Sequence, residues 1–135
     1  MKVSARERTS LRAMEEFARR YGQGPTALRE VAEVQGLPLP YLGRVAVSLR
    51  RAGLLESVRG AHGGYLLSRT PSEISVGDIF RAVEGSIVPL ECTDGEGATC
   101  ANVSDCAARS VWQAVTRRLE ETLDSTSLAD LLQRE

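Results

Sequence analysis

The sequence lacks long hydrophobic runs and has a single histidine, and these two shortages exclude several classes of protein. No stretch of about 18 apolar residues occurs, so no segment is predicted to span a membrane. The first ten residues, MKVSARERTS, contain no apolar core of a signal peptide, and we therefore expect the protein to stay in the cytoplasm. His62 has no second histidine and no nucleophile–base pair to work with, so no enzyme activity is predicted.

Charge is plentiful but unevenly distributed along the 135 residues. The net charge is −1, whereas residues 1–70 carry a net charge of +6 and residues 71–135 a net charge of −7. One explanation is chance segregation of solvated side chains. The other is a basic half that contacts phosphates beside an acidic half that does not. The chain is long enough to form one domain with its own hydrophobic core.

The basic half contains three predicted helices. A first helix is expected from its N-cap Ser4 to about Tyr21, where glycines follow. A second is expected over 27–35 with Thr26 as its N-cap, and a tight turn over 36–38 leads into a third. Two short helices joined through a glycine-containing turn are typical of a helix-turn-helix, whose second helix enters the major groove of DNA.

The third helix has two distinct faces, and a predicted hairpin follows it. One face is apolar at helical spacing and is predicted to be buried: Leu42, Val45, Ala46 and Leu49. A second stripe is predicted to face water or a partner: Tyr41, Arg44, Ser48 and Arg51. Two apolar runs then come at 54–58 and 65–67, joined by a glycine-rich connection typical of a β-hairpin. We therefore predict a winged helix-turn-helix, mainly α with a small β-hairpin wing that has Arg59 at its base.

The acidic half is predicted to begin with a short helix and a loop. Ser75 and Asp78 have the form of a capping box for a helix that ends at Gly85. No helical period is present over 86–104, so this stretch is predicted to be a loop.

A long amphipathic helix is expected from about Ser104 to Asp124, followed by a short segment capped by Ser127. Within a small winged domain this long helix has little to pack against. We expect it to pair with its counterpart in a second chain, and packing onto the first helix is the alternative. A homodimer would place two recognition helices about one turn of DNA apart, on a palindromic operator. The predicted division is a DNA-binding domain over 1–85, a loop over 86–106 and a dimerisation segment over 107–135.

All three cysteines fall in the predicted loop region, as Cys92, Cys100 and Cys106. An odd number in a cytoplasmic chain argues against a structural disulfide framework. Neither gap between them has the short spacing that is usual in zinc sites. Three thiolates on a glycine-containing loop suit an iron–sulfur cluster, for which thiolate sulfur is the preferred ligand. Three free thiols, or a thiol sensor without metal, remain the alternatives.

Several segments follow a family pattern in order along nearly the whole chain: MKVS, LREVAEVQGLPLPYL, LRRAGLLESVRGAHGGYLLSR, ISVGDIFRAVEG, the three cysteines, VWQAV and LADLL. On these segments the sequence resembles the IscR/NsrR group of the Rrf family of bacterial regulators. The resemblance implies a homodimeric winged-helix transcription regulator that carries a 2Fe–2S or 4Fe–4S cluster. The state of that cluster would control which promoters are bound.

The same resemblance implies roles for individual residues. The cluster ligands would be the three cysteines, and Arg59 matches a wing arginine that enters the minor groove. Gly63, Gly64 and Tyr65 match positions that shape the hairpin, and Tyr41 with its neighbours matches the recognition helix. His62 lies in the wing loop, where it is expected to touch a phosphate or nothing.

The sequence departs from the family pattern at the fourth cluster ligand and in the recognition helix. Arg109 stands where the IscR branch has a histidine, and an arginine cannot ligate a metal. Arg8 stands where NsrR-like members have an acidic residue, so the neighbouring Glu7 is the candidate fourth ligand. Gly43 and Arg44 replace the Glu-Gln pair that is frequent after Tyr-Leu. Arg44 has the bidentate fork that recognises guanine, so we expect a different operator preference.

The sequence thus predicts a homodimeric DNA-binding regulator that senses redox state, nitric oxide or iron–sulfur supply through a cluster. Two alternatives stay open. One is a cluster-free thiol switch, and the other is a regulator controlled by docking of a protein partner on the acidic half.

Overall fold

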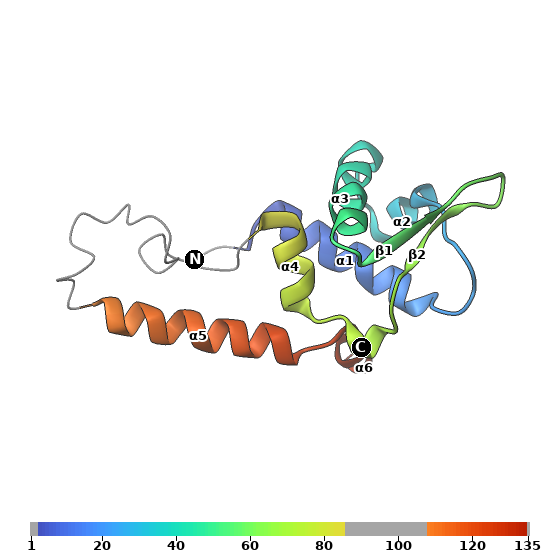
Figure 1. The fold of residues 1–135 in the computed structure, drawn as a ribbon. Coiled ribbons are helices and arrows are strands. Elements are labelled where there is room, and N and C mark those ends of the chain that lie inside the picture. The colour runs from blue at the N-terminus through green and yellow to red at the C-terminus, as the bar shows by residue number, and fades with distance from the viewer. Residues whose placement is uncertain (1–2, 86–107, 135) are drawn as a thin grey trace.

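The computed structural model describes residues 3–85 and 108–134, and it has the mainly helical fold with a small hairpin that the sequence predicts (Figure 1). The elements in chain order are α1 (Ala5–Arg19), α2 (Leu28–Gln35), α3 (Leu39–Arg51), β1 (Leu55–Val58), β2 (Gly64–Leu67), the short 3-10 helix η1 (Pro71–Glu73), α4 (Val76–Glu84), α5 (Arg109–Ser125) and α6 (Leu128–Gln133). Strands β1 and β2 pair antiparallel, with Leu55 opposite Leu67. No helix among the described residues is long and apolar enough to cross a bilayer.

Helix α1 lies at the centre of the fold and contacts α2, α3, α4 and α6. Its predicted N-cap is confirmed, because the Ser4 hydroxyl accepts from the N–H of Glu7 at 3.0 Å. Met14 is fully buried at its middle. The predicted buried face of α3 is also confirmed, with Leu42, Val45, Ala46 and Leu49 all in the core.

The end of α1 differs from the sequence prediction. The helix ends at Arg19, and Tyr21 is 47% exposed instead of continuing the apolar stripe. Gly22 and Gly24 follow with φ angles of +87° and +88°, a conformation that favours glycine and turns the chain away from the helix axis. The apolar character of Tyr21 suggested a helix two residues longer than the backbone makes.

Thr26 was predicted to cap α2, and this prediction is wrong. The N-cap residue of α2 is Ala27, which makes no side-chain capping hydrogen bond. Thr26 instead forms an isolated antiparallel bridge with Tyr65 of β2. Thr26 therefore pairs with a residue 39 positions away in the chain instead of capping the helix that follows it. A local sequence pattern does not reveal such a distant partner.

The acidic half packs more closely onto the winged body than the sequence suggested. The capping box of Ser75 and Asp78 is confirmed at the start of α4. Helix α5 contacts α4, and Arg81 of α4 forms a bidentate ion pair with Asp124 of α5 at 2.7 and 2.8 Å. The expectation that this helix has little to pack against is therefore wrong for its C-terminal half. Its predicted start, near Ser104, lies outside the described residues.

The last helix, α6, belongs to the core of the winged body. Its predicted cap is confirmed, because the Ser127 hydroxyl accepts from the N–H of Asp130. Leu128 is fully buried, and its N–H donates to the carbonyl of Ile74 at 2.9 Å. The division of the chain at 85 and 106 stays a prediction, since the segment between those positions lies outside the described residues.

Candidate nucleic-acid interface

Helix α3 presents a basic surface without acidic residues to solvent. It contains Arg44, Arg50 and Arg51, all exposed, and no aspartate or glutamate. Ion pairs are formed by Arg19, Arg20 and Arg81, whereas none within residues 3–85 and 108–134 involves an arginine of α3. The three guanidinium groups of α3 are therefore available to an anion outside the chain. Such groups bind phosphate and the edge of guanine through paired N–H donors.

Two members of the predicted outer stripe of α3 do not point freely outward. Tyr41 is half-buried and packs against the core. The hydroxyl of Ser48, also half-buried, accepts from Nη2 of Arg6 at 3.4 Å and donates to the carbonyl of Arg44 at 3.4 Å. Helix α1 covers this edge of α3, which the periodicity of α3 alone does not show. The exposed part of the predicted stripe is therefore Arg44 and Arg51.

Gly43 lies beside Arg44 inside α3, and its surroundings are open. A methyl group placed on it would meet no other part of the described chain within 4 Å. Its φ angle is not among the positive ones, so an alanine would fit both the space and the backbone. Neither packing within the chain nor backbone conformation accounts for a glycine at this position.

The hairpin forms the predicted wing beyond α3. Arg59 directly follows β1 and is exposed, and His62 is exposed at the tip. Gly63 follows with its backbone so close to β1 that an added methyl group would overlap the carbonyl oxygen of Val58. Figure 1 shows the hairpin projecting from the end of the fold where α2 and α3 lie, with α5 running away from that end. The wing and α3 thus both lie at this end of the fold, and each carries exposed arginines.

The base of the wing is tied to the start of the helix-turn-helix. The N–H of Thr26 donates to the carbonyl of Tyr65 at 2.8 Å, and the N–H of Tyr65 donates to the carbonyl of Thr26 at 2.8 Å. Gly64 precedes this bridge at φ +155°, and an added methyl group there would overlap the backbone of Thr26. A glycine is thus required at 64 for the close approach. The sequence pattern predicts Gly64 in the hairpin but does not reveal the bridge between Thr26 and Tyr65.

The candidate cluster ligands are only partly within the described residues. Cys92, Cys100 and Cys106 lie outside them, so their mutual placement stays a prediction. Among residues 3–85 and 108–134, no three His, Cys, Asp or Glu side chains gather closely enough to hold a metal ion. Glu7 is half-buried in the first turn of α1, and its Oε1 accepts from the backbone N–H of Ser4 at 3.0 Å.

Comparison with known proteins places this geometry in a family. A family model described as "Rrf2: Iron-dependent Transcriptional regulator" matches residues 3–134. The chain belongs to the Rrf2 family. The resemblance inferred from the sequence segments is thereby confirmed. The Rrf2 chain is a DNA-binding transcription regulator and not an enzyme.

Individual relatives of this Rrf2 chain match it over nearly its full length. The HTH-type transcriptional regulator CymR of Bacillus subtilis (strain 168) is 40% identical over 131 residues, covering 97% of this chain and 89% of the relative. A solved structure described as T. potens IscR has a TM-score of 0.81 at 42% identity, covering 99% of this chain and 88% of that one. The oxidized form of Staphylococcus aureus CymR has a TM-score of 0.76 at 36% identity, covering 97% of this chain and 95% of that one. The winged-helix fold predicted from the sequence is confirmed by these matches.

Proposed function

We propose that this Rrf2 regulator binds a palindromic operator as a homodimer, with α3 in the major groove and the wing against the minor groove. The support is the exposed, acid-free basic surface of α3 together with the exposed Arg59 at the wing. Arg44 and Arg51 would contact base edges and phosphates, and Tyr41 and Ser48 would support them from the edge of the helix. His62, Gly63 and Gly64 would shape the wing loop and its approach to the backbone of DNA.

The wing contact is tested with Arg59→Ala on an operator selected from randomised DNA duplexes. We expect weaker specific binding and a slope of log affinity against log salt that falls by about one, because one phosphate-contacting cation is lost. Arg69→Ala is the matched control, since Arg69 carries the same charge but follows β2 instead of forming part of the loop. Equal operator affinity of Arg59→Ala and the unaltered protein would exclude the wing contact.

The proposed signal is redox state, nitric oxide or iron–sulfur supply, sensed through a cluster held by Cys92, Cys100 and Cys106. The observation that carries this proposal is the confinement of all three cysteines to the segment between α4 and α5. The family description "Iron-dependent" supports it. Three soft thiolate donors suit iron in a 2Fe–2S or 4Fe–4S cluster, and such a group supplies an electron-transfer or ligand-labile centre when bound.

The position of Glu7 is compatible with its role as the fourth ligand. The Ser4 hydroxyl, which accepts from the N–H of Glu7, also donates to Oε1 of Glu84 at 2.7 Å. Glu84 is the last residue of α4, and in the sequence the cysteine-containing segment begins two positions later, at residue 86. The first turn of α1 is therefore joined to the end of α4 from which that segment continues. The capping bond engages Oε1 of Glu7, so ligation would fall to its other oxygen.

The cluster is tested by an absorption spectrum with iron and sulfide analysis on protein purified without oxygen. Visible charge-transfer bands and about two or four iron atoms per chain are expected. The number of iron atoms per chain identifies the cluster type. A colourless, iron-free protein that resists reconstitution would overturn the cluster proposal and leave DNA binding unaffected.

Coupling between the cluster and DNA is a separate proposal. A cluster shifts DNA affinity only if it stabilises one setting of the recognition helices over another. Replacing Cys100 with Ala is expected to abolish the difference in operator affinity between reconstituted and untreated protein. Retention of that difference in the variant would exclude Cys100 from the coupling.

A cluster-free thiol switch is the second candidate. The similarity to CymR, of which an oxidized form has been solved, favours it. In this case the three cysteines would change oxidation state without binding metal, and thiolate exposure would set their reactivity. Operator affinity that changes on thiol oxidation of iron-free protein would support this candidate over the cluster.

A further inference from the structure

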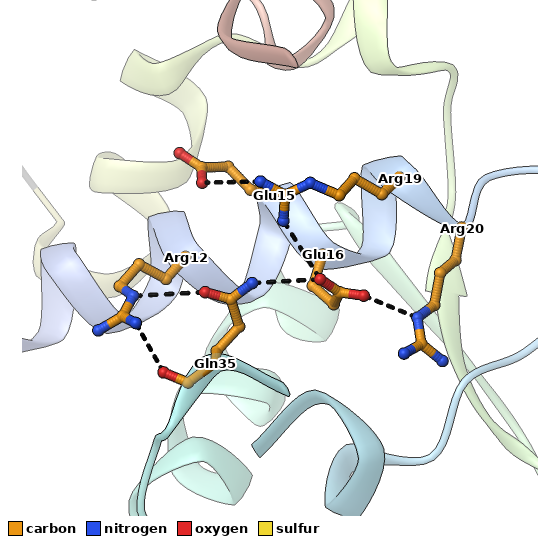
Figure 2. A network of polar contacts seen from close by, with 6 residues as sticks. All are labelled: Arg12, Glu15, Glu16, Arg19, Arg20 and Gln35. Atoms are coloured by element: carbon orange, nitrogen blue, oxygen red, sulfur yellow. Dashed lines mark hydrogen bonds and ion pairs between the residues drawn. The ribbon is translucent and has the colours of Figure 1, made fainter. Parts of the chain in front are cut away.

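Gln35, the last residue of α2, is held by α1 at three points (Figure 2). Nη2 of Arg12 donates to the backbone carbonyl of Gln35 at 2.7 Å, and Nε of Arg12 donates to its side-chain oxygen at 3.4 Å. The side-chain nitrogen of Gln35 donates to Oε1 of Glu16 at 3.1 Å. We call Arg12, Gln35 and Glu16 the α1–α2 clamp.

The acceptor at the centre of the clamp is a buried carboxylate. Glu16 is only 5% exposed, and besides Gln35 it accepts from Arg20 at 2.8 Å and from Arg19 at 3.2 Å. Burial by itself would raise the pKa of Glu16, but the hydrogen bonds from Arg20 and Gln35 and the charge of Arg20 outweigh it. The pKa of Glu16 therefore lies below its ordinary value of 4.5. The carboxylate stays charged at neutral pH and is a strong, directional acceptor for Gln35.

The place of the clamp gives it a role beyond the packing of two helices. Gln35 is followed by Gly36, which has φ +64° and ends α2, and α3 begins three residues later at Leu39. The turn is itself closed by a hydrogen bond from the N–H of Leu37 to the carbonyl of Ala32 at 2.9 Å. The backbone of Gln35 therefore fixes the point from which the recognition helix α3 starts.

Apolar packing alone holds α2 weakly. The helix has eight residues, of which only Val31 and Ala32 are buried. Leu28 also packs on the core but is only half-buried, and these three apolar contacts resist sliding along α1 poorly because hydrophobic contact has little directional preference. Hydrogen bonds to a charged group require defined distances and angles. The clamp provides such directional hydrogen bonds at the end of α2 nearest to α3.

We propose that the α1–α2 clamp positions the helix-turn-helix for specific DNA recognition, with Glu16 and Gln35 as its positioning residues. The clamp does not contact DNA in this proposal. It holds the recognition helix at the angle at which Arg44 and Arg51 reach the groove. Non-specific binding depends on charge and not on that angle, so the two kinds of binding respond differently to loss of the clamp.

The proposal is tested with Glu16→Gln and Gln35→Met in the full chain. Affinity is measured for the selected operator duplex and for a duplex of the same length with scrambled sequence. Each variant is expected to lose about tenfold in operator affinity, a loss typical of hydrogen bonds to a charged group. Binding to the scrambled duplex is expected to stay unchanged. Glu15→Gln is the matched control, since Glu15 is the adjacent acid on α1 and its ion pair, with Arg19, stays within that helix.

A second readout does not depend on DNA. Backbone amides of the turn and of the first turn of α3 are expected to exchange hydrogen faster in Gln35→Met than in Glu15→Gln. Gln35 is partly exposed, so its replacement tests the clamp even where Glu16→Gln fails to fold. Folded Gln35→Met with unaltered operator affinity and unaltered exchange would overturn the proposal. Equal losses on both duplexes would also overturn it, because they indicate general destabilisation.

Discussion

Gly43 is the residue of the recognition helix that the fold leaves unexplained. A glycine inside an exposed helix costs about 1 kcal/mol of stability relative to alanine. The open space around Gly43 shows that no neighbour in the described chain requires it. The surface of α3 that carries Gly43 and Arg44 is the proposed DNA contact, and we infer that a glycine at this position lets that surface approach DNA closely.

Gly43→Ala is expected to stabilise the protein by about 1 kcal/mol and to weaken operator binding. The added methyl group removes backbone freedom in the unfolded chain but holds α3 further from the groove. Urea unfolding and operator titration measure the two effects. Gly77→Ala is the comparison, since a methyl group there would overlap Oδ1 of Asp124 and disturb its ion pair with Arg81, so a smaller gain in stability than for Gly43→Ala is expected. Stronger operator binding by Gly43→Ala would contradict the close approach.

Glu16 predicts a pH dependence of stability. Its pKa is lower in the folded protein than its ordinary value of 4.5, so the folded state favours the charged form. Its contribution is fully present above about pH 4.5 and is lost as the pH falls through the lower, folded-state pKa. The difference in unfolding free energy between the unaltered protein and Glu16→Gln is therefore expected to shrink on acidification below pH 4.5. A difference that is constant from pH 7 to pH 3 would contradict this assignment.

Individual residues were predictable from the sequence where their partners are local. The capping serines Ser4 and Ser75 each bond a residue three positions away, so the pattern contains both partners. Thr26 was misassigned as a cap because Tyr65, its partner, lies on a distant part of the chain, and the contact between Ser48 and Arg6 was missed for the same reason. A single-sequence pattern gives the periodicity of one helix but not the neighbour that covers its edge.

At the scale of elements, the wing is an extension of the helix-turn-helix and not an independent hairpin. A two-stranded hairpin is marginally stable by itself in water. The bridge between Thr26 and Tyr65 and the packing of Leu55 and Leu67 in the core join this one to the body. The glycine-rich connection predicted that a hairpin forms. It did not predict the attachment of the hairpin to the helix-turn-helix, because that attachment depends on the close approach of Gly64 to Thr26.

Gly64→Ala is expected to detach the base of the wing. The added methyl group overlaps the backbone of Thr26 and also makes φ +155° unfavourable. We expect a loss of about 1–3 kcal/mol of stability, the range for strain at a special backbone conformation. Faster amide exchange at Tyr65 and Thr26 would locate the damage. Gly60→Ala is the control for backbone strain without overlap, because Gly60 has φ +118° but open space around it, so wild-type exchange at Tyr65 and Thr26 is expected in that variant. Wild-type exchange at Tyr65 in Gly64→Ala would contradict the bridge.

At the scale of the whole molecule, α5 has one end that packs on α4 and one end that exposes two large apolar side chains. Its C-terminal half is fixed to α4 by Arg81 and Asp124. In its N-terminal part Val111 is 54% exposed and Trp112 is 40% exposed. Large apolar side chains exposed together on one helix are typical of an interface with another protein. The amphipathic period was predictable from the sequence, whereas its division into two halves follows from where α4 ends.

Trp112→Ala is expected to weaken the proposed homodimer. A buried tryptophan at an interface contributes 2 kcal/mol or more, about a 30-fold change in dissociation constant. Light scattering across a dilution series measures that shift. Gln113→Ala serves as the control, since Gln113 is an exposed polar neighbour. A chain that is monomeric before any substitution, or a dimer unaffected by Trp112→Ala, would exclude this surface.

Helix α1 connects the end of α4 with the end of α2. Its first turn reaches Glu84, the last residue of α4, through Ser4, and its later turns hold the end of α2 through Arg12 and Glu16. Fifteen residues of α-helix form a stiff rod about 22 Å long, so a displacement of one end of α1 also displaces the other end. A shift of a few tenths of an ångström at the end of α4 would thus reach the turn that precedes α3 through contacts that stay formed.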